Sequence, residues 1–239
     1  MPTLLADQEH EIDMIIVREN SEGEYAGPGG TVHGGHANEL AIQTNVFTRE
    51  GVERAMRYGF ELARKRRGRV TNVTKSNALL HGMVFWDKVA AEVAEDFPDV
   101  EYETLYVDAA TMKFLINPGW FDVIVTTNMF GDILSDLGGA LIGSIGLAPS
   151  SNVNPERRFP SMFEPVHGSA PDIAGLGYAN PIATILAGAM MLEHLGEIEA
   201  AERVRVAVEA TLAGGVKTRD LGGMVGTQEM ATRIVTDMR

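Results

Sequence analysis

The sequence predicts an α/β fold, because short apolar runs typical of buried strands alternate along the chain with segments of helical periodicity. Strands are expected at residues 12–17, 39–47, 69–74, 101–107 and 122–127. Helices are expected at residues 51–65, 85–97, 109–116, 130–142, 182–195, 200–213 and 229–238. Several of the strands end at a charged or polar residue, which is where α/β proteins place their sites.

Capping residues mark the ends of two of these helices. Thr48 stands before the first and can accept a hydrogen bond from a free backbone N–H. Asn180 and Pro181 fit the N-cap and the first position of the helix at 182–195, and Gly196 closes it. That helix is apolar on several faces, which predicts that it is buried.

Changes in composition divide the chain. Residues 23–35 are rich in glycine and precede the strand at 39–47, so an exposed hairpin arm is expected at about 27–47. Residues 147–161 are rich in proline, serine and asparagine, which is typical of a boundary between domains. We therefore expect two parts, residues 1–146 and residues 147–239.

Composition excludes several classes of protein. The 239 residues are 45% hydrophobic, enough for a sizeable core, and the formal net charge is −13. This acidic balance argues against nucleic acid or an anionic membrane as partner. The chain has no cysteine, which excludes disulfides and thiol catalysis. Its first residues do not resemble a signal peptide, so a cytoplasmic location is expected.

A run of basic residues at 64–69 could mark a nucleic-acid patch. Cations at the C-terminus of a helix more often lie in solvent and interact favourably with the helix dipole, and we favour that interpretation. His33 and His36 could bind a metal, but no further ligand stands nearby, which favours a solvated turn.

Two aspartates four residues apart, Asp132 and Asp136, share one face of an expected helix. Like charges at this spacing destabilise a helix by about 0.2–0.5 kcal/mol, and a cation between them reverses the sign. Carboxylate oxygens suit Mg²⁺ or Mn²⁺. Taken alone the pair is weak evidence for a metal, because most such pairs are simply solvated.

Three further residues could carry chemistry. Asp108 follows an alternating strand and could also cap the next helix. Lys75 follows another strand, and a lysine near a cation and carboxylates suits proton transfer, although it could be an ordinary surface lysine. Tyr25 lies in a glycine-flanked loop, where its hydroxyl could act as a general acid or merely anchor the loop.

A polar loop at 164–172 offers backbone N–H groups, a histidine and Asp172, which could hold ribose hydroxyls. The sequence contains no G-x-G-x-x-G, so an ordinary Rossmann site is not supported.

Five motifs in order resemble the isocitrate/isopropylmalate dehydrogenase family over nearly the whole chain. They are RENSEGEY at 18–25, TKSN at 74–77, VDAATM at 107–112, NMFGDILSD at 128–136 and HGSAPDIAG at 167–175. Within the family, NPER at 154–157 and FEPVHGSAPDI at 163–173 most resemble the branch of tartrate and D-malate dehydrogenases. The fold implied is that of isopropylmalate dehydrogenase, incomplete at the N-terminus, because members begin with a further portion on the order of a hundred residues.

The resemblance implies NAD- and metal-dependent oxidation and decarboxylation of a 2-hydroxy acid such as D-malate or tartrate. Mg²⁺ or Mn²⁺ is expected on Asp108, Asp132 and Asp136, with Lys75 taking the hydroxyl proton, Tyr25 protonating the enol and Arg18 clamping a carboxylate. The expected cofactor residues are Asn77, Glu164, His167, Gly168, Ser169, Ala170, Asp172, Ile173 and Asn180. Asp172 with Ile173 resembles the form that prefers NAD, and an acidic group there would repel a 2′-phosphate.

The family also implies a homodimer with shared active sites. Lys75, Asn77 and Asp108 are expected from one subunit, and Tyr25, Asp132 and Asp136 from the other, with the arm at 27–47 joining the two. Two alternatives stay open: a 3-isopropylmalate dehydrogenase, and a truncated, non-catalytic remnant that forms dimers.

Overall fold

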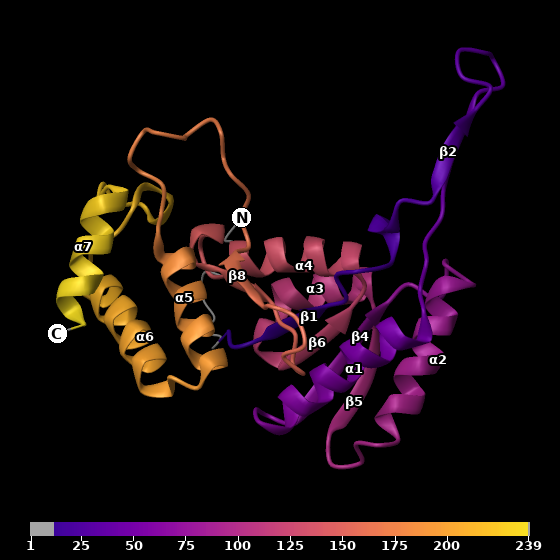
Figure 1. Ribbon diagram of the computed structural model, residues 1–239, viewed down its shortest axis with the longest axis horizontal. Helices are drawn as coiled ribbons and strands as arrows, with labels where there is room; N and C mark the ends of the chain where they lie inside the picture. Colours follow the sequence, from indigo (N-terminus) through magenta and orange to yellow (C-terminus); the bar gives the residue numbers. More distant parts are fainter. Residues whose placement is uncertain (1–11, 239) are drawn as a thin grey trace. The chain divides into compact units, whose positions relative to one another are not determined.

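The computed structural model describes residues 12–238 (Figure 1). The described residues form two units that divide between Ser135 and Asp136. The elements confirm an α/β fold. Helix α4 (Asn128–Leu141) crosses the division between the units. The expected division at 146/147, and the roles assigned to its two parts, stay predictions. Within the described residues no helix is long and apolar enough to cross a membrane.

A four-stranded parallel sheet forms the centre of the first unit, with strand order β1-β6-β4-β5. Its strands are β1 (Ile15–Arg18), β4 (Arg69–Thr74), β5 (Glu101–Tyr106) and β6 (Val123–Thr126). The helices and 3-10 turns of this unit are α1 (Arg49–Arg64), α2 (Gly82–Ala94), α3 (Val107–Ile116), η1 (Glu24–Ala26) and η2 (Pro118–Trp120). All four strands therefore end on the same side of the sheet.

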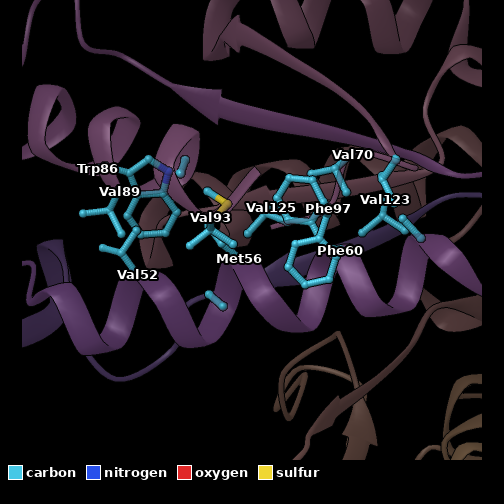
Figure 2. Packing of buried hydrophobic residues seen from close by; sticks show 14 of the residues in the cluster. Val52, Met56, Phe60, Val70, Trp86, Val89, Val93, Phe97, Val123 and Val125 are labelled. Atoms are coloured by element: carbon cyan, nitrogen blue, oxygen red, sulfur yellow. The ribbon is translucent and has the colours of Figure 1, made fainter. Parts of the chain in front are cut away.

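The core of this unit lies between the sheet and the helices α1 and α2 (Figure 2). Helix α1 contributes Val52, Met56 and Phe60, which pack against valines of β4 and β6. As predicted, Thr48 caps α1, its hydroxyl accepting a hydrogen bond from the backbone N–H of Gly51 at 3.1 Å. This packing fixes the sheet whose strand ends carry the predicted site residues.

The expected hairpin arm is present as β2 (Gly29–Val32) paired antiparallel with β3 (Leu40–Gln43). Every residue of both strands is exposed, and the hairpin projects away from the sheet of its unit (Figure 1). His33 and His36 form its turn, where the N–H of His36 donates to the carbonyl of His33 at 3.0 Å. The solvated turn expected for these histidines is confirmed.

The second unit contains a hairpin and three helices. The elements are β7 (Pro149–Asn152), β8 (Met162–Pro165), η3 (Ile145–Leu147), α5 (Ile182–Leu195), α6 (Ile198–Ala213), η4 (Arg219–Leu221) and α7 (Thr227–Asp237). Helix α5 has the bounds expected from the sequence and ends at Gly196, whose φ of 92° is left-handed. The predicted positions were wrong by one residue, because the N-cap is Pro181 and Asn180 stands before it, although Asn180 Oδ1 accepts from the N–H of Ile182 at 3.0 Å.

The basic run at 64–69 forms hydrogen bonds within the fold, which does not favour a nucleic-acid patch. The guanidinium of Arg66 donates to Asp122 at 2.8 Å, and the backbone N–H groups of Arg67 and Arg69 donate to the same carboxylate. Asp122 is 1% exposed. The interpretation as a solvated helix end was therefore wrong for Arg66, whose side chain is 18% exposed and pairs with a buried carboxylate distant in sequence.

Candidate functional site

The predicted catalytic residues of the first unit gather where its parallel strands end. Arg18 ends β1, Lys75 follows β4, and Asp108 lies just after β5. Asn128 begins α4 two residues after β6 ends. Neighbouring strands bring these residues together in two groups, because β1 pairs with β6 and β4 pairs with β5.

The first group is built around Arg18. Its Nη1 donates to Asp132 Oδ1 at 2.8 Å, and its Nε and Nη2 donate to Asn128 Oδ1 at 2.9 and 2.6 Å. Asn128 in turn donates to the carbonyl of Glu22 at 3.3 Å. Gly131 lies under this arrangement: a Cβ there would come within 2.6 Å of the Arg18 side chain. The helix α4 thus holds the guanidinium in a defined place.

Tyr25 belongs to the same group. Its hydroxyl donates to Asp132 Oδ2 at 3.2 Å, and the Arg18 guanidinium carbon lies 5.7 Å from its ring centroid. Desolvation, followed by the charge and hydrogen bond of Asp132, raises the pKa of the Tyr25 hydroxyl above its ordinary value. A tyrosine hydroxyl is protonated near neutral pH, which is the state that a proton donor requires.

The second group is the ion pair of Lys75 and Asp108. Lys75 Nζ lies 2.6 Å from Asp108 Oδ1 and 5.8 Å from the ring centroid of Tyr106. The hydrogen bond from Lys75 lowers the pKa of the Asp108 carboxyl. Asp108 lies inside the first turn of α3 rather than at its N-cap, which is Tyr106. The predicted N-cap role was therefore wrong, although an anion is also favourable in the first turn.

The two groups stay separate in the part of the chain that the structure describes. No hydrogen bond or ion pair among residues 12–238 joins Lys75 or Asp108 to Arg18, Tyr25 or Asp132. No three histidine or acidic side chains of these residues gather as metal ligands.

The side-chain types nevertheless suit a hard divalent cation. Asp132 and Asp136 stand one turn apart on α4, and the carboxylates of Asp132 and Asp108 are 49% and 67% exposed. Their oxygens are thus accessible to a ligand. Two of these carboxylates lie on one helix, and Asp108 lies in the first turn of α3.

Of the predicted cofactor residues, Asn77 lies in the first unit and the others in the second. In the second unit, the loop from Gly168 to Asp172 is exposed, and Ala170 has a left-handed φ of 42°. The loop is closed by a turn in which the N–H of Ile173 donates to the carbonyl of Ala170 at 3.1 Å. His167 Nδ1 lies 2.9 Å from the carbonyl of Gly168.

Asn180 lies at the end of this loop, and both the oxygen and the nitrogen of its side-chain amide form hydrogen bonds. It accepts from the N–H of Ile182 and donates to Asp220 Oδ2 at 2.9 Å. Hydrogen bonds from Ser144, Thr218 and Asn180 lower the pKa of the Asp220 carboxyl, although burial opposes them. The predicted cofactor residues from Gly168 to Asp172 therefore lie in an exposed loop that ends at a hydrogen-bonded Asn180, whereas Glu164 lies in β8.

Three residues of the first group were not assigned from the sequence. Asn128 lies in a quoted motif and follows a strand, which was a usable signal. Glu19 and Glu24 are 4% and 8% exposed, and both carboxylates hold the loop that carries Tyr25. Both lie in the quoted motif at 18–25, but acidic residues in a loop ordinarily face solvent, so their burial was not predictable from the sequence.

Comparison with known proteins gives one family. The family model described as isocitrate/isopropylmalate dehydrogenase matches residues 2–235. A probable tartrate dehydrogenase/decarboxylase of Agrobacterium vitis is 54% identical over 225 residues, which cover 94% of this chain and 63% of that protein. The decarboxylating D-malate dehydrogenase of Escherichia coli is 49% identical over 237 residues, covering 97% of this chain and 66% of that protein.

Solved structures agree with this match. The crystal structure of isocitrate dehydrogenase from Methylococcus capsulatus superposes with a TM-score of 0.89 at 44% identity, covering 96% of this chain and 68% of that one. The chain spans about 63% of the length of the Agrobacterium relatives.

Proposed function

The chain belongs to the isocitrate/isopropylmalate dehydrogenase family, and from that premise we propose that it carries out the oxidation and decarboxylation of a 2-hydroxy acid such as D-malate or tartrate. The observation that supports this most is the arrangement of Arg18, Tyr25 and Asp132 in one hydrogen-bonded group at the end of a parallel sheet. A cation-binding carboxylate, a protonated hydroxyl and a guanidinium are the groups that such a reaction uses.

Each residue has a proposed role. Arg18 binds a substrate carboxylate, for which a guanidinium can supply two parallel hydrogen bonds. Lys75 accepts the proton of the substrate hydroxyl as the carbon is oxidised, directly or through a water. Tyr25 donates a proton to carbon after CO₂ has left, and the contact of its hydroxyl with Asp132 supports its place in the site.

A divalent cation and NAD⁺ complete the proposal. Asp108, Asp132 and Asp136 would hold Mg²⁺ or Mn²⁺, which supplies polarisation of the substrate oxygens and electrostatic stabilisation of developing negative charge. NAD⁺ supplies the acceptor for the hydride. Its adenosine half is proposed to lie along the loop from His167 to Asn180, with Asp172 near the ribose and Asn77 and Glu164 also in contact.

A homodimer would unite the separate groups. We propose that Lys75, Asn77 and Asp108 of one subunit act with Tyr25, Asp132 and Asp136 of the other. Two observations support this: no three ligands gather among the residues described, and the β2–β3 hairpin exposes the apolar side chains of Val32, Leu40 and Ile42.

A 3-isopropylmalate dehydrogenase is the alternative within the family, and a non-catalytic remnant that forms dimers is the alternative outside catalysis. The names of the relatives favour tartrate and D-malate over isopropylmalate. The ordered contacts of Arg18, Tyr25 and Asp132 favour an enzyme over a remnant.

The test measures NADH formation by the purified chain with Mn²⁺ and D-malate, tartrate or 3-isopropylmalate. A second protein, in which the chain follows the N-terminal portion of the Agrobacterium relative, is assayed beside it. We expect the extended protein to turn over D-malate or tartrate fastest. Absence of turnover by the extended protein on all three substrates would exclude the enzyme.

A further inference from the structure

Three glutamates fix the loop that joins β1 to the hairpin arm. Glu19 accepts from the backbone N–H groups of Ser21 and Glu22 and from Arg54, so it folds the loop on itself. Glu22 accepts from the N–H and hydroxyl of Thr48, which ties the loop to the start of α1. Glu24 ties the loop to the start of α4. The contacts of Glu19 and Glu22 outside the loop lead to α1, whereas those of Glu24 lead to the start of α4, so the effect of Glu24 is separable from theirs by substitution.

Glu24 is a buried carboxylate with uncharged partners. It is 8% exposed, its Oε1 accepts from the hydroxyl of Thr127 at 3.3 Å, and its Oε2 accepts from the N–H of Met129 at 3.3 Å. No lysine, arginine or histidine of residues 12–238 forms an ion pair with it. Burying an unpaired charge is costly, and the N-terminus of α4 offsets part of that cost.

The turn at Gly23 aims Glu24 inward and leaves Tyr25 outward. Gly23 is buried with a left-handed φ of 80°, and a Cβ there would lie 3.4 Å from the ring of Phe47. Glu24 is buried, whereas Tyr25, the next residue, is 55% exposed. On α4, Met129 lies three residues before Asp132, within the same turn.

We propose that Glu24 is a positioning residue for Tyr25: by binding the start of α4 it holds the Tyr25 hydroxyl against Asp132 in the place from which it donates its proton. The inference rests on the proposed function, in which Tyr25 is the proton donor. Glu24 itself touches neither substrate nor cofactor. The Gln43 side chain adds to the same hold, since its Nε2 donates to the carbonyl of Glu24 at 3.2 Å.

The test compares Glu24→Ala and Glu24→Gln with Glu22→Gln, a control in the same loop whose contacts lead to α1. Glu24→Ala is expected to lower kcat about tenfold to a hundredfold, the scale of a reacting group misplaced by about 1 Å, with a smaller change in KM. Glu24→Gln keeps an acceptor for Met129 and should recover most of the rate, while Glu22→Gln should stay close to the unsubstituted protein.

Two kinetic readouts separate positioning from general damage. Slower proton donation raises the solvent deuterium isotope effect on kcat, whereas a loss of folded protein leaves it unchanged. In a Tyr25→Phe background, Glu24→Ala should cause no further loss of kcat, since the group that it positions is gone. An unchanged isotope effect, or losses that multiply in the double variant, would overturn the inference.

Hydrogen exchange supplies a readout that is independent of activity. Glu24→Ala should speed amide exchange in residues 23–26 and 127–132, and Glu22→Gln should not. If exchange there is unchanged, Glu24 does not position the loop, even where Tyr25 is the donor. If exchange rises but Tyr25→Phe keeps full kcat, the proposed role of Tyr25 has failed and Glu24 only anchors the loop.

Discussion

The two ends of the parallel sheet both carry carboxylates paired with basic residues, but the carboxylates differ in exposure. Where the strands begin, Asp122 is 1% exposed and accepts from Arg66, Arg67 and Arg69. Where they end, the carboxylates of Asp108 and Asp132 are 67% and 49% exposed, with one cation partner each. The first arrangement leaves no room for a ligand, and the second leaves oxygens free for one.

This difference in exposure implies different roles for the buried ion pair and the exposed ion pairs. A buried carboxylate with several donors stabilises the fold, because removing its partners would leave a buried charge unpaired. An exposed pair contributes little to stability and can exchange its partners for a ligand. Substitutions at the end of the strands should therefore change chemistry, and substitutions at their beginning should change stability.

The largest effect is expected from Lys75→Met in the extended protein. Loss of a general base lowers kcat by about 10²–10⁴-fold, and we expect about 10³-fold with little change in the melting temperature. Lys88→Met is the control, because Lys88 is an exposed lysine on α2. A kcat within a few fold of the unsubstituted protein would exclude Lys75 as the base.

The next effect is on the metal. Asp132→Asn removes a charged ligand and should weaken Mn²⁺ binding on the order of a hundredfold, the scale of losing one charge-assisted contact. Electron paramagnetic resonance of free Mn²⁺ measures this affinity directly. Asp96→Asn, at an exposed aspartate paired with Arg57, is the control. Equal affinities for Asp132→Asn and the unsubstituted protein would show that Asp132 is not a ligand.

At the opposite end of the sheet, Asp122→Asn should act on stability. The substitution removes the charge that three donors share, and about 2 kcal/mol of unfolding free energy is expected to be lost. Urea denaturation followed by circular dichroism measures this loss. Mn²⁺ affinity should not change. If Asp122→Asn bound Mn²⁺ less tightly but unfolded at the same urea concentration, Asp122 would act in metal binding and not in stability.

The sequence was most informative about residues that follow strands. Lys75 and Asp108 come directly after runs whose apolar pattern predicted β4 and β5, so their place at the end of the sheet was predictable. Their contact was not, because it depends on β4 and β5 being neighbours. The contact of Arg18 with Asp132 likewise requires β1 beside β6, and local patterns carry no information about strand order.

The stretch at 147–161 shows what composition leaves unpredicted. Its prolines, serines and asparagines indicated a boundary between domains but gave no sign that residues Pro149–Asn152 form β7 and pair with β8. Tertiary pairing outweighed the weak intrinsic preference of these residues for strands. Glu24 was missed for a similar reason: its burial depends on the turn at Gly23 and on the start of α4, which are distant in sequence from each other.

The smallest effect concerns pH and the exposed pair. Lys75 holds the pKa of Asp108 below its ordinary value, so the folded state binds the Asp108 proton less tightly than the unfolded state does. The pair therefore stabilises the fold above the unfolded pKa of about 4, and this contribution is lost as the pH falls through the lower, folded value. In calorimetry, Asp108→Asn should melt slightly below the unsubstituted protein at pH 6, and the difference should vanish on acidification. A difference that persists or grows toward pH 3 would mean that Asp108 acts through a contact other than its charge.

Because the Asp108 carboxylate is exposed, the change in melting temperature for Asp108→Asn should be smaller than that for Asp122→Asn. A larger change for Asp108→Asn would remove the distinction between the two ends of the sheet.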